Sequence, residues 1–287
     1  MSTVDQLLRA GSRRLGGIGG SPRLDAEILL AHAVGQTRES LYRSLFETVS
    51  DDSEQRFTSL LDERASRRPV AQLVGRRDFW TFSVEVTRAT LVPRPETELL
   101  VERALARIPA DAAWAVADLG TGTGAVALAL ALERPGCKVL ATDLSKPALT
   151  VARRNAKALG LRNVAFARGD WLEALPEPDE PKGRFHVLVS NPPYIAADEW
   201  AATDPELAFE PRIALDGGVD GLDPYRVLAA GAARHLRPGG WLLLEHGFRQ
   251  ADGVQSLLKQ AGFGNLATAS DLEGRPRVTE GQIGGTR

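Results

Sequence analysis

The chain has 287 residues, 43% of them hydrophobic and 25% charged, which is typical of a globular protein and excludes a disordered or collagen-like chain. Thirty-five basic and 37 acidic side chains leave a formal charge of −2, which argues against a protein held on nucleic acid mainly through phosphate contacts. We find no apolar run near the roughly 18 residues of a membrane helix and no signal segment. The single cysteine excludes an internal disulfide and a multi-cysteine zinc site. We therefore expect a cytoplasmic protein.

The first part of the chain, residues 1–74, is predicted to be a small helical domain. Thr3 and Gln6 have the spacing of a capping box, and Ser21-Pro22 and Ser50–Ser53 are two further helix starts. Basic and acidic side chains balance in this region. We expect a helical bundle that helps to bind a partner, not a basic arm for nucleic acid.

Residues 75–112 are predicted to connect this bundle to the rest of the chain. Apolar residues alternate with polar ones from Trp80 to Val86, which predicts one strand of a hairpin. The following segment, Leu91–Glu98, contains two prolines that fix the backbone and remove hydrogen-bond donors, so we expect a rigid loop. A helix is predicted from about Thr97 to Arg107.

From residue 113 to 287, short apolar strands alternate with helices, which predicts an α/β domain with a mostly parallel, twisted, Rossmann-like sheet and helices on both faces. The expected strands are 115–119, 138–142, 164–167, 187–190 and 241–245, and the expected helices are 124–133, 147–159, 224–236 and 251–261. Two weaker strands are expected between Ala267 and Thr279, an acidic, proline-rich surface loop at 176–183 and a flexible tail at 281–287.

Polar residues follow several of these strands, and in such sheets ligands bind at the carboxyl ends of the strands. Glycines at 120, 122 and 124 allow a tight turn and close approach of a ligand to the backbone. Asp143 ends the next strand, where a carboxylate can accept hydrogen bonds from both ribose hydroxyls. This loop by itself does not distinguish a nicotinamide cofactor from another adenosine-bearing cofactor.

The sequence Asn191-Pro192-Pro193-Tyr194 distinguishes between them. Two prolines stiffen the turn, so the Asn191 side-chain oxygen and the Pro192 carbonyl are two fixed acceptors that suit a planar NH2 group, with Tyr194 as an aromatic face beside it. Hydride transfer does not need this arrangement. Methyl transfer from a sulfonium to an amide nitrogen does, because the nitrogen must be oriented for in-line approach.

Together these features resemble the class I S-adenosylmethionine methyltransferases, and among them the release factor glutamine N5-methyltransferases. The resemblance covers nearly the whole chain. It depends on the helical N-terminal region and on the motifs Arg76–Trp80, Leu91–Glu98, Asp118–Gly124, Asn191–Tyr194, Phe209–Arg212, Leu243–Gly247 and Arg277–Thr279. The Pro-Arg-Pro-Glu-Thr-Glu part of Leu91–Glu98 is the most specific of them.

The resemblance implies S-adenosyl-L-methionine as cofactor, S-adenosyl-L-homocysteine as product and no metal. The implied acceptor is the glutamine of the Gly-Gly-Gln motif of class-one peptide chain release factors, and we expect a monomer that needs neither a membrane nor nucleic acid. The implied cofactor-binding residues are Gly120, Thr121, Gly122, Thr123, Gly124, Asp143 at the ribose, Trp171 at the adenine, and Asn191. The implied catalytic residues are Asn191, Pro192 and Tyr194, and the implied substrate-binding residues are these three and Pro193.

Other functions remain open at this point. The same chemistry could act on an exocyclic amino group of DNA or RNA, which would have to be flipped out of a duplex, or on a glutamine of a ribosomal protein. A nicotinamide-dependent dehydrogenase and a binding protein that uses the fold as a scaffold are less favoured, because neither explains Asn191–Tyr194. Arg94, Glu96 and Glu210 could serve the site or only anchor loops, and His246 is interpreted as a hydrogen-bonded structural histidine.

Overall fold

The computed structural model describes residues 2–177 and 185–284, and contacts between residues divide the chain into two compact units. The first unit contains the residues up to Arg76 together with the distant segment Asp204–Phe209. The second unit contains Arg77–Thr203 and Glu210 onward. The sequence does not predict that Asp204–Phe209 packs with the N-terminal helices, and the division at residues 74 and 112 stays a prediction.

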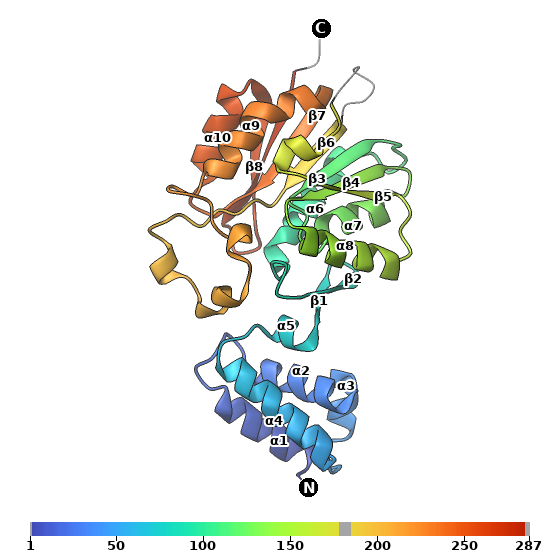
Figure 1. Cartoon of the computed structure of the whole chain (residues 1–287), viewed down its shortest axis with the longest axis vertical. Helices are drawn as coiled ribbons and strands as arrows, with labels where there is room; N and C mark the ends of the chain where they lie inside the picture. Colours follow the sequence, from blue (N-terminus) through green and yellow to red (C-terminus); the bar gives the residue numbers. More distant parts are fainter. Residues whose placement is uncertain (1, 178–184, 285–287) are drawn as a thin grey trace. The chain divides into compact units, whose positions relative to one another are not determined.

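The first unit is a bundle of helices around an apolar core (Figure 1). Its helices are α1 (Val4–Arg14), α2 (Pro22–Val34), α3 (Arg38–Arg43), α4 (Asp51–Ala65) and α5 (Val70–Val74). The predicted capping box is present, because Thr3 and Gln6 each accept a hydrogen bond from the other's backbone N–H. Leu8, Leu29 and Phe57 are almost fully buried between the helices, so apolar packing holds the bundle together.

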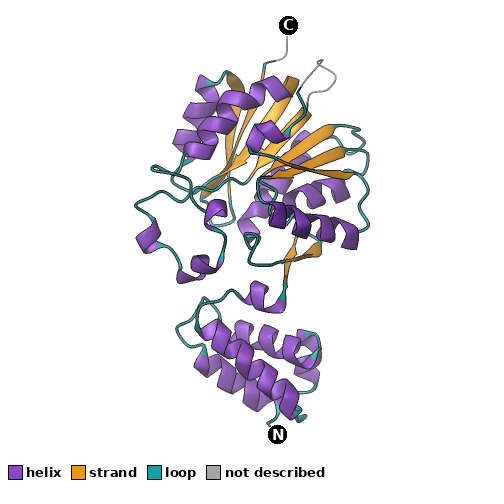
Figure 2. Cartoon of the chain, in the orientation of Figure 1, coloured by secondary structure: helices purple, strands orange, loops and turns teal. Residues whose placement is uncertain are grey.

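The second unit contains a seven-stranded sheet with the order β5-β4-β3-β6-β7-β9-β8 (Figure 2). The strands are β3 (Ala115–Leu119), β4 (Lys138–Asp143), β5 (Val164–Arg168), β6 (Phe185–Ser190), β7 (Leu236–Glu245), β8 (Phe263–Ser270) and β9 (Pro276–Ile283). Strands β3 to β7 run parallel, whereas β9 is antiparallel to both of its neighbours. The predicted mostly parallel α/β sheet is confirmed.

Helices cover both faces of this sheet (Figure 1). The helices are α6 (Glu98–Arg107), α7 (Ala125–Glu133), α8 (Lys146–Ala158), α9 (Asp223–His235) and α10 (Ala251–Gln260), with 3-10 turns η1 (Pro95–Thr97), η2 (Trp171–Ala174), η4 (Trp200–Ala202) and η6 (Arg212–Ala214). The turn η5 (Pro205–Phe209) belongs to the first unit. Val187 and Val189 of β6 join the apolar core with α6 and α7, while Leu188 joins the core with α9. The sheet is therefore buried on both sides, as its continuous apolar strands predict.

Two predictions about strand limits are wrong. Trp80 has a positive φ of 56° and lies in the turn between β1 (Arg76–Phe79) and β2 (Phe82–Glu85), where its N–H donates to Glu98 and its indole to Glu133. These hydrogen bonds outweigh the alternating pattern that predicts a strand at Trp80.

The predicted flexible tail at 281–287 is also wrong for its first three residues. Gly281 and Gln282 pair with β7, and Ile283 pairs with β8, so β9 is a long inner strand and not a weak one. A Cβ at Gly281 would lie 2.8 Å from Leu266 Cδ2, so a larger residue here would require the Leu266 side chain to shift. Residues 285–287, and most of the predicted acidic loop at 176–183, lie outside the described residues.

Candidate active site

The glycine loop connects β3 to α7 at the carboxyl edge of the sheet. Gly120, Gly122 and Gly124 all have positive φ, at 75°, 57° and 87°, which an L side chain would resist. Gly122 has open space where a Cβ would be, whereas a Cβ at Gly124 would lie 3.2 Å from Ala152 Cβ. Gly122 therefore leaves room for a ligand, and Gly124 serves the close packing of α7 on α8.

Two carboxyl groups, those of buried Asp118 and half-buried Asp143, hold this loop in place. Asp118 at the end of β3 accepts hydrogen bonds from Thr121 Oγ1 at 2.6 Å and from the Ala127 N–H at 3.2 Å. Asp143 at the end of β4 accepts from the backbone N–H groups of Gly122 at 2.9 Å and Ser145 at 2.8 Å. Burial raises the pKa of Asp118 to about 7 and also raises that of Asp143. Each carboxylate oxygen of Asp143 has a further lone pair for a ligand hydroxyl.

Trp171 lies over the glycine loop from the turn that follows β5. A Cβ at Gly120 would lie 3.2 Å from Trp171 Cζ3, so the indole packs directly on the loop. Trp171 itself has a φ of 43°, a left-handed conformation that is uncommon for a bulky residue. Such strain is more frequent at ligand-binding sites than elsewhere.

A cavity of about 270 Å³ lies beside this loop in the second unit. Its lining includes most of the predicted cofactor residues, namely Gly120, Thr121, Gly122, Thr123, Asp143, Trp171 and Asn191, together with Pro193. Gly124, Pro192 and Tyr194 are not among the lining residues. The structure thus brings the glycine loop and the Asn191 turn to one cavity, which is the size expected at the lower limit of small-molecule sites.

The Asn191–Tyr194 turn follows β6. Hydrogen bonds with Thr97 and Gln250 hold it in place. Asn191 Nδ2 donates to Thr97 Oγ1 at 3.2 Å, and Gln250 donates to the Tyr194 carbonyl at 2.9 Å. Within residues 2–177 and 185–284, neither Asn191 Oδ1 nor the Pro192 carbonyl accepts a hydrogen bond. The two acceptors that the sequence predicts are therefore available to a substrate.

The rigid loop before α6 is held by Glu210, a residue whose role the sequence leaves open. The buried Glu210 carboxylate pairs with Arg94 and accepts a hydrogen bond from the Val92 N–H at 3.0 Å. The next residues, Pro211 and Ile213, line the cavity. Arg94 and Glu210 therefore anchor one wall of the cavity, and the loop-anchoring interpretation accounts for their contacts.

His246 is held in place by hydrogen bonds to both nitrogens of its ring. The partners of this buried side chain are Thr279 Oγ1 and the Gly247 carbonyl, at 2.9 Å each. Burial lowers the pKa of the ring, as expected for a structural histidine.

Three residues of the candidate site were not predicted from the sequence. They are Thr97, Asp118 and Glu245, and all three lie within motifs named above. Their positions at strand ends or in the rigid loop could have indicated a role in the site. The sequence does not show which residues they contact in the folded protein.

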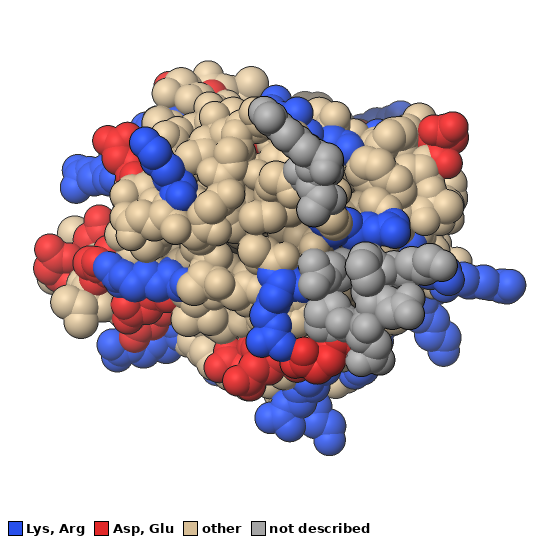
Figure 3. Space-filling view, turned by 90° about the horizontal axis from the view of Figure 1, so that it is seen from above, with Lys and Arg blue, Asp and Glu red and all other residues tan. Residues whose placement is uncertain are grey.

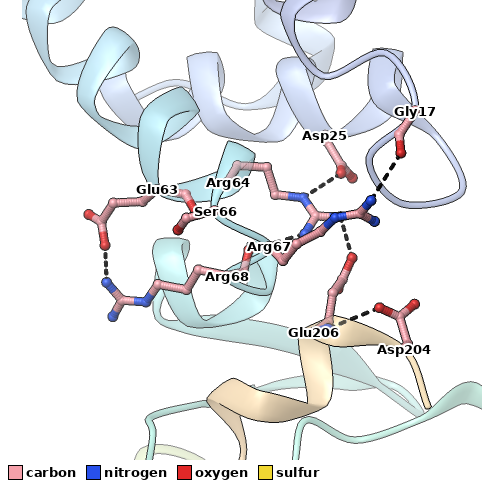
Figure 4. A network of polar contacts seen from close by, with 9 residues as sticks. All are labelled: Gly17, Asp25, Glu63, Arg64, Ser66, Arg67, Arg68, Asp204 and Glu206. Atoms are coloured by element: carbon pink, nitrogen blue, oxygen red, sulfur yellow. Dashed lines mark hydrogen bonds and ion pairs between the residues drawn. The ribbon is translucent and has the colours of Figure 1, made fainter. Parts of the chain in front are cut away.

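The helical unit has a polar cluster of its own around Arg64 (Figure 4). Arg64, only 3% exposed, bonds Asp25 at 2.8 Å and Glu206 at 2.6 Å. Gln72 donates to the Phe209 carbonyl at 3.0 Å. These contacts hold the segment Asp204–Phe209, which follows the Asn191 turn in sequence, against the helices of its own unit.

Comparison with known proteins identifies the family. Residues 6–75 match the family described as "PrmC N-terminal domain", and residues 110–266 match a "Methyltransferase domain". The chain is 50% identical over 279 residues to the release factor glutamine methyltransferase of Xylella fastidiosa (strain Temecula1), covering 97% of this chain and 98% of the relative. The chain belongs to the release factor glutamine methyltransferases. It is therefore an enzyme that transfers methyl groups.

Two further similarities agree with this family. The release factor glutamine methyltransferase of Pseudomonas aeruginosa is 46% identical over 262 residues, covering 91% of this chain and 93% of that one. A solved 16S rRNA N2 G1207 methyltransferase of T. thermophilus, in complex with AdoMet and guanosine, has a TM-score of 0.51 at 23% identity, covering 72% of this chain and 49% of that chain. The last similarity shows that the chain shares the class I methyltransferase fold.

The surface of the chain carries charges of both signs. On the face seen in Figure 3, described Lys and Arg side chains are interspersed with Asp and Glu side chains around an uncharged centre. The described residues of that face thus do not form a continuous basic surface. Among the described residues, no helix is both long and apolar enough to cross a membrane.

Proposed function

We propose that this chain transfers a methyl group from S-adenosyl-L-methionine to the side-chain amide nitrogen (N5) of the glutamine in the Gly-Gly-Gln motif of class-one peptide chain release factors. The observation that carries the proposal is the pair of available acceptors, Asn191 Oδ1 and the Pro192 carbonyl, at the turn that borders the glycine-loop cavity. The relatives named for this activity, 50% and 46% identical, support it.

The cavity fits the proposed cofactor. Gly122 leaves open space at the loop, Asp143 offers carboxylate lone pairs for ribose hydroxyls, and the indole of Trp171 offers an apolar face for a purine ring. The rRNA methyltransferase of the same fold was solved with AdoMet bound. When bound, the cofactor supplies a methyl group on a positively charged sulfur.

The Asn191 turn fits a carboxamide acceptor. The two hydrogens of a glutamine NH2 group can be donated to Asn191 Oδ1 and the Pro192 carbonyl, which fixes the plane of the amide and the direction of its nitrogen. The bound cofactor would supply the methyl group from its sulfur, and the glutamine nitrogen, held in this orientation, would exchange one hydrogen, released as a proton to solvent, for that methyl group. Pro193 lines the cavity, whereas Pro192 and Tyr194 do not. We propose that Pro192 and Tyr194 shape the part of the site that binds the glutamine.

Three features of the protein's context also belong to the proposal. Placement in the cytoplasm agrees with release factors as substrates. A monomer suffices, because every residue assigned here to the cavity comes from one unit of one chain. The helical unit would contact the release factor outside its Gly-Gly-Gln motif.

The test is mass spectrometry of a purified release factor after incubation with the chain and S-adenosyl-L-methionine. We expect the mass of one added methyl group on the peptide that contains Gly-Gly-Gln, and no addition when the glutamine of this motif is replaced by glutamate. Parallel reactions would contain tRNA, rRNA, DNA and ribosomal protein. Methyl transfer to one of these with an unmodified release factor would refute the proposal.

A further inference from the structure

Glu245 lies directly behind the Asn191 turn, and no role has so far been assigned to it. Strands β6 and β7 are parallel neighbours with Ser190 opposite Leu244, so the next residues along each strand, Asn191 and Glu245, lie side by side at the carboxyl edge. Thr97 reaches the same place from the rigid loop before α6. Glu245 is 3% exposed and Thr97 is 4% exposed, so water does not compete for their hydrogen bonds.

The three side chains form a chain of hydrogen bonds with a definite direction. Thr97 Oγ1 donates to Glu245 Oε1 at 3.1 Å, and Asn191 Nδ2 donates to Thr97 Oγ1 at 3.2 Å. A hydroxyl has one hydrogen, and an ionised carboxylate only accepts. Once the hydrogen of Thr97 points to Glu245, its oxygen can only accept, and therefore it requires the NH2 end of the Asn191 amide.

This direction decides which end of Asn191 faces the substrate. If the Asn191 amide were turned by 180°, its Oδ1 would lie against the lone pairs of Thr97, and its NH2 group would face the NH2 group of the incoming glutamine. Two donors cannot bond each other, so the acceptor that the proposed reaction needs would be lost. An asparagine by itself does not choose between these two orientations.

We propose that Thr97 and Glu245 are positioning residues that keep the Asn191 carboxamide oriented with Oδ1 toward the methyl-accepting nitrogen. This inference rests on the proposed function, since it concerns how the same site holds a glutamine amide. It assigns Glu245 a function without contact to substrate, and it gives the threonine of the Pro-Arg-Pro-Glu-Thr-Glu segment a chemical task.

A second observation makes a purely structural role for Glu245 unfavourable. Its other carboxylate oxygen, Oε2, is buried without a hydrogen bond within the described ranges. A buried carboxylate oxygen without a partner costs stability, and an apolar side chain of similar size would avoid that cost. A glutamine would keep the shape without the charge, but it could donate its own N–H to Thr97, which would free the hydroxyl hydrogen for Asn191 and allow the wrong orientation.

The carboxyl of Glu245 is the group in this chain of hydrogen bonds whose protonation depends on pH. Burial raises the pKa of Glu245 to about 7, and the charge of Glu96 also raises it, while the hydrogen bond from Thr97 and the charge of Arg277 lower it. Glu96, Tyr194, Tyr225 and His246 are the other titratable groups beside it, and Tyr225 donates to the Glu245 backbone carbonyl at 2.9 Å. A protonated Glu245 can donate to Thr97, so the preferred orientation should weaken as pH falls below about 7.

The experiment compares Thr97→Val with Thr97→Ser on the full chain, using release factor methylation and binding of S-adenosyl-L-homocysteine. Valine has the shape of threonine without the hydroxyl, and serine keeps the hydroxyl. We expect Thr97→Val to lower kcat by on the order of 100-fold, as for other misplaced catalytic groups, with Kd for S-adenosyl-L-homocysteine within about twofold of the wild type. Thr97→Ser should keep most of kcat.

A third variant, Glu245→Gln, keeps the test decisive if Thr97→Val does not fold. Wild-type kcat should rise as pH increases through about 7, and this rise should be absent in Glu245→Gln. A wild-type kcat in Thr97→Val, equal losses in Thr97→Val and Thr97→Ser, or the same pH profile in Glu245→Gln as in the wild type would overturn the inference. The wild-type chain is the active reference in each comparison, so its failure to methylate a release factor would refute the proposed function instead.

Discussion

Asp118 supports the glycine loop at a measurable cost in folding stability. Its carboxyl is fully buried, and burial raises its pKa from the ordinary 3.8 to about 7. The folded protein therefore holds the Asp118 proton more tightly than the unfolded chain does. Stability from this group is complete below pH 3.8 and is lost as pH rises toward 7, because over this range the unfolded chain gives up the proton while the folded protein keeps it.

The size of this effect follows from the pKa difference. Each pH unit between the two pKa values removes about 1.4 kcal/mol from the free energy of unfolding. Between pH 5 and pH 7 the decline that Asp118 causes should be about 2 kcal/mol, because the folded protein also begins to lose the proton near pH 7. Asp118→Asn has no proton to lose, so its free energy of unfolding should decline by about 2 kcal/mol less than that of the wild type over the same range.

The assay is urea unfolding at pH 5, 6 and 7, followed by tryptophan fluorescence. The matched control is Asp220→Asn, because Asp220 is exposed in the same unit and its hydrogen bond with Arg226 lowers its pKa to about 2. Asp220 is ionised in both states from pH 5 to 7, so its replacement should leave the decline unchanged. An identical decline in Asp118→Asn and the wild type would refute this account of the buried carboxyl.

Three further substitutions separate cofactor binding, chemistry and folding. Asn191→Ala should lower kcat by about 100-fold or more and leave cofactor Kd nearly unchanged in calorimetry, and full activity would contradict the proposed mechanism. Asp143→Ala should weaken cofactor binding by about tenfold to 100-fold through lost ribose hydrogen bonds, and an unchanged Kd would exclude that role. Arg64→Met should destabilise the helical unit by about 3 kcal/mol in thermal unfolding and speed proteolysis at Asp204–Phe209. As a control, Arg67→Met, at a half-buried residue of the same cluster that donates to the Gly17 carbonyl at 3.3 Å, should cost no more than about 1 kcal/mol.

Local patterns in the sequence were sufficient for the fold class and for placing two parts of the candidate site. Apolar strands alternating with helices predict the parallel sheet, since burial on both faces requires continuous apolar strands. The glycines at 120 and 122 and the Asn191 turn were predictable because the conformation of a short turn is encoded within a few residues. Placing both at the carboxyl edge of the sheet then brings them to one cavity.

Contacts between residues far apart in the chain were decided only by the tertiary structure. Thr97 meets Asn191 and Glu245 across 94 and 148 residues, and Arg94 meets Glu210 across 116. The long strand β9 likewise depends on pairing partners in β7 and β8. Neither hydrophobic period nor turn chemistry specifies which side chain faces which across such separations, because that choice depends on strand register and on the packing of neighbouring elements. The orientation of Asn191, on which the proposed chemistry depends, is for this reason a property of the folded protein and not of its motif.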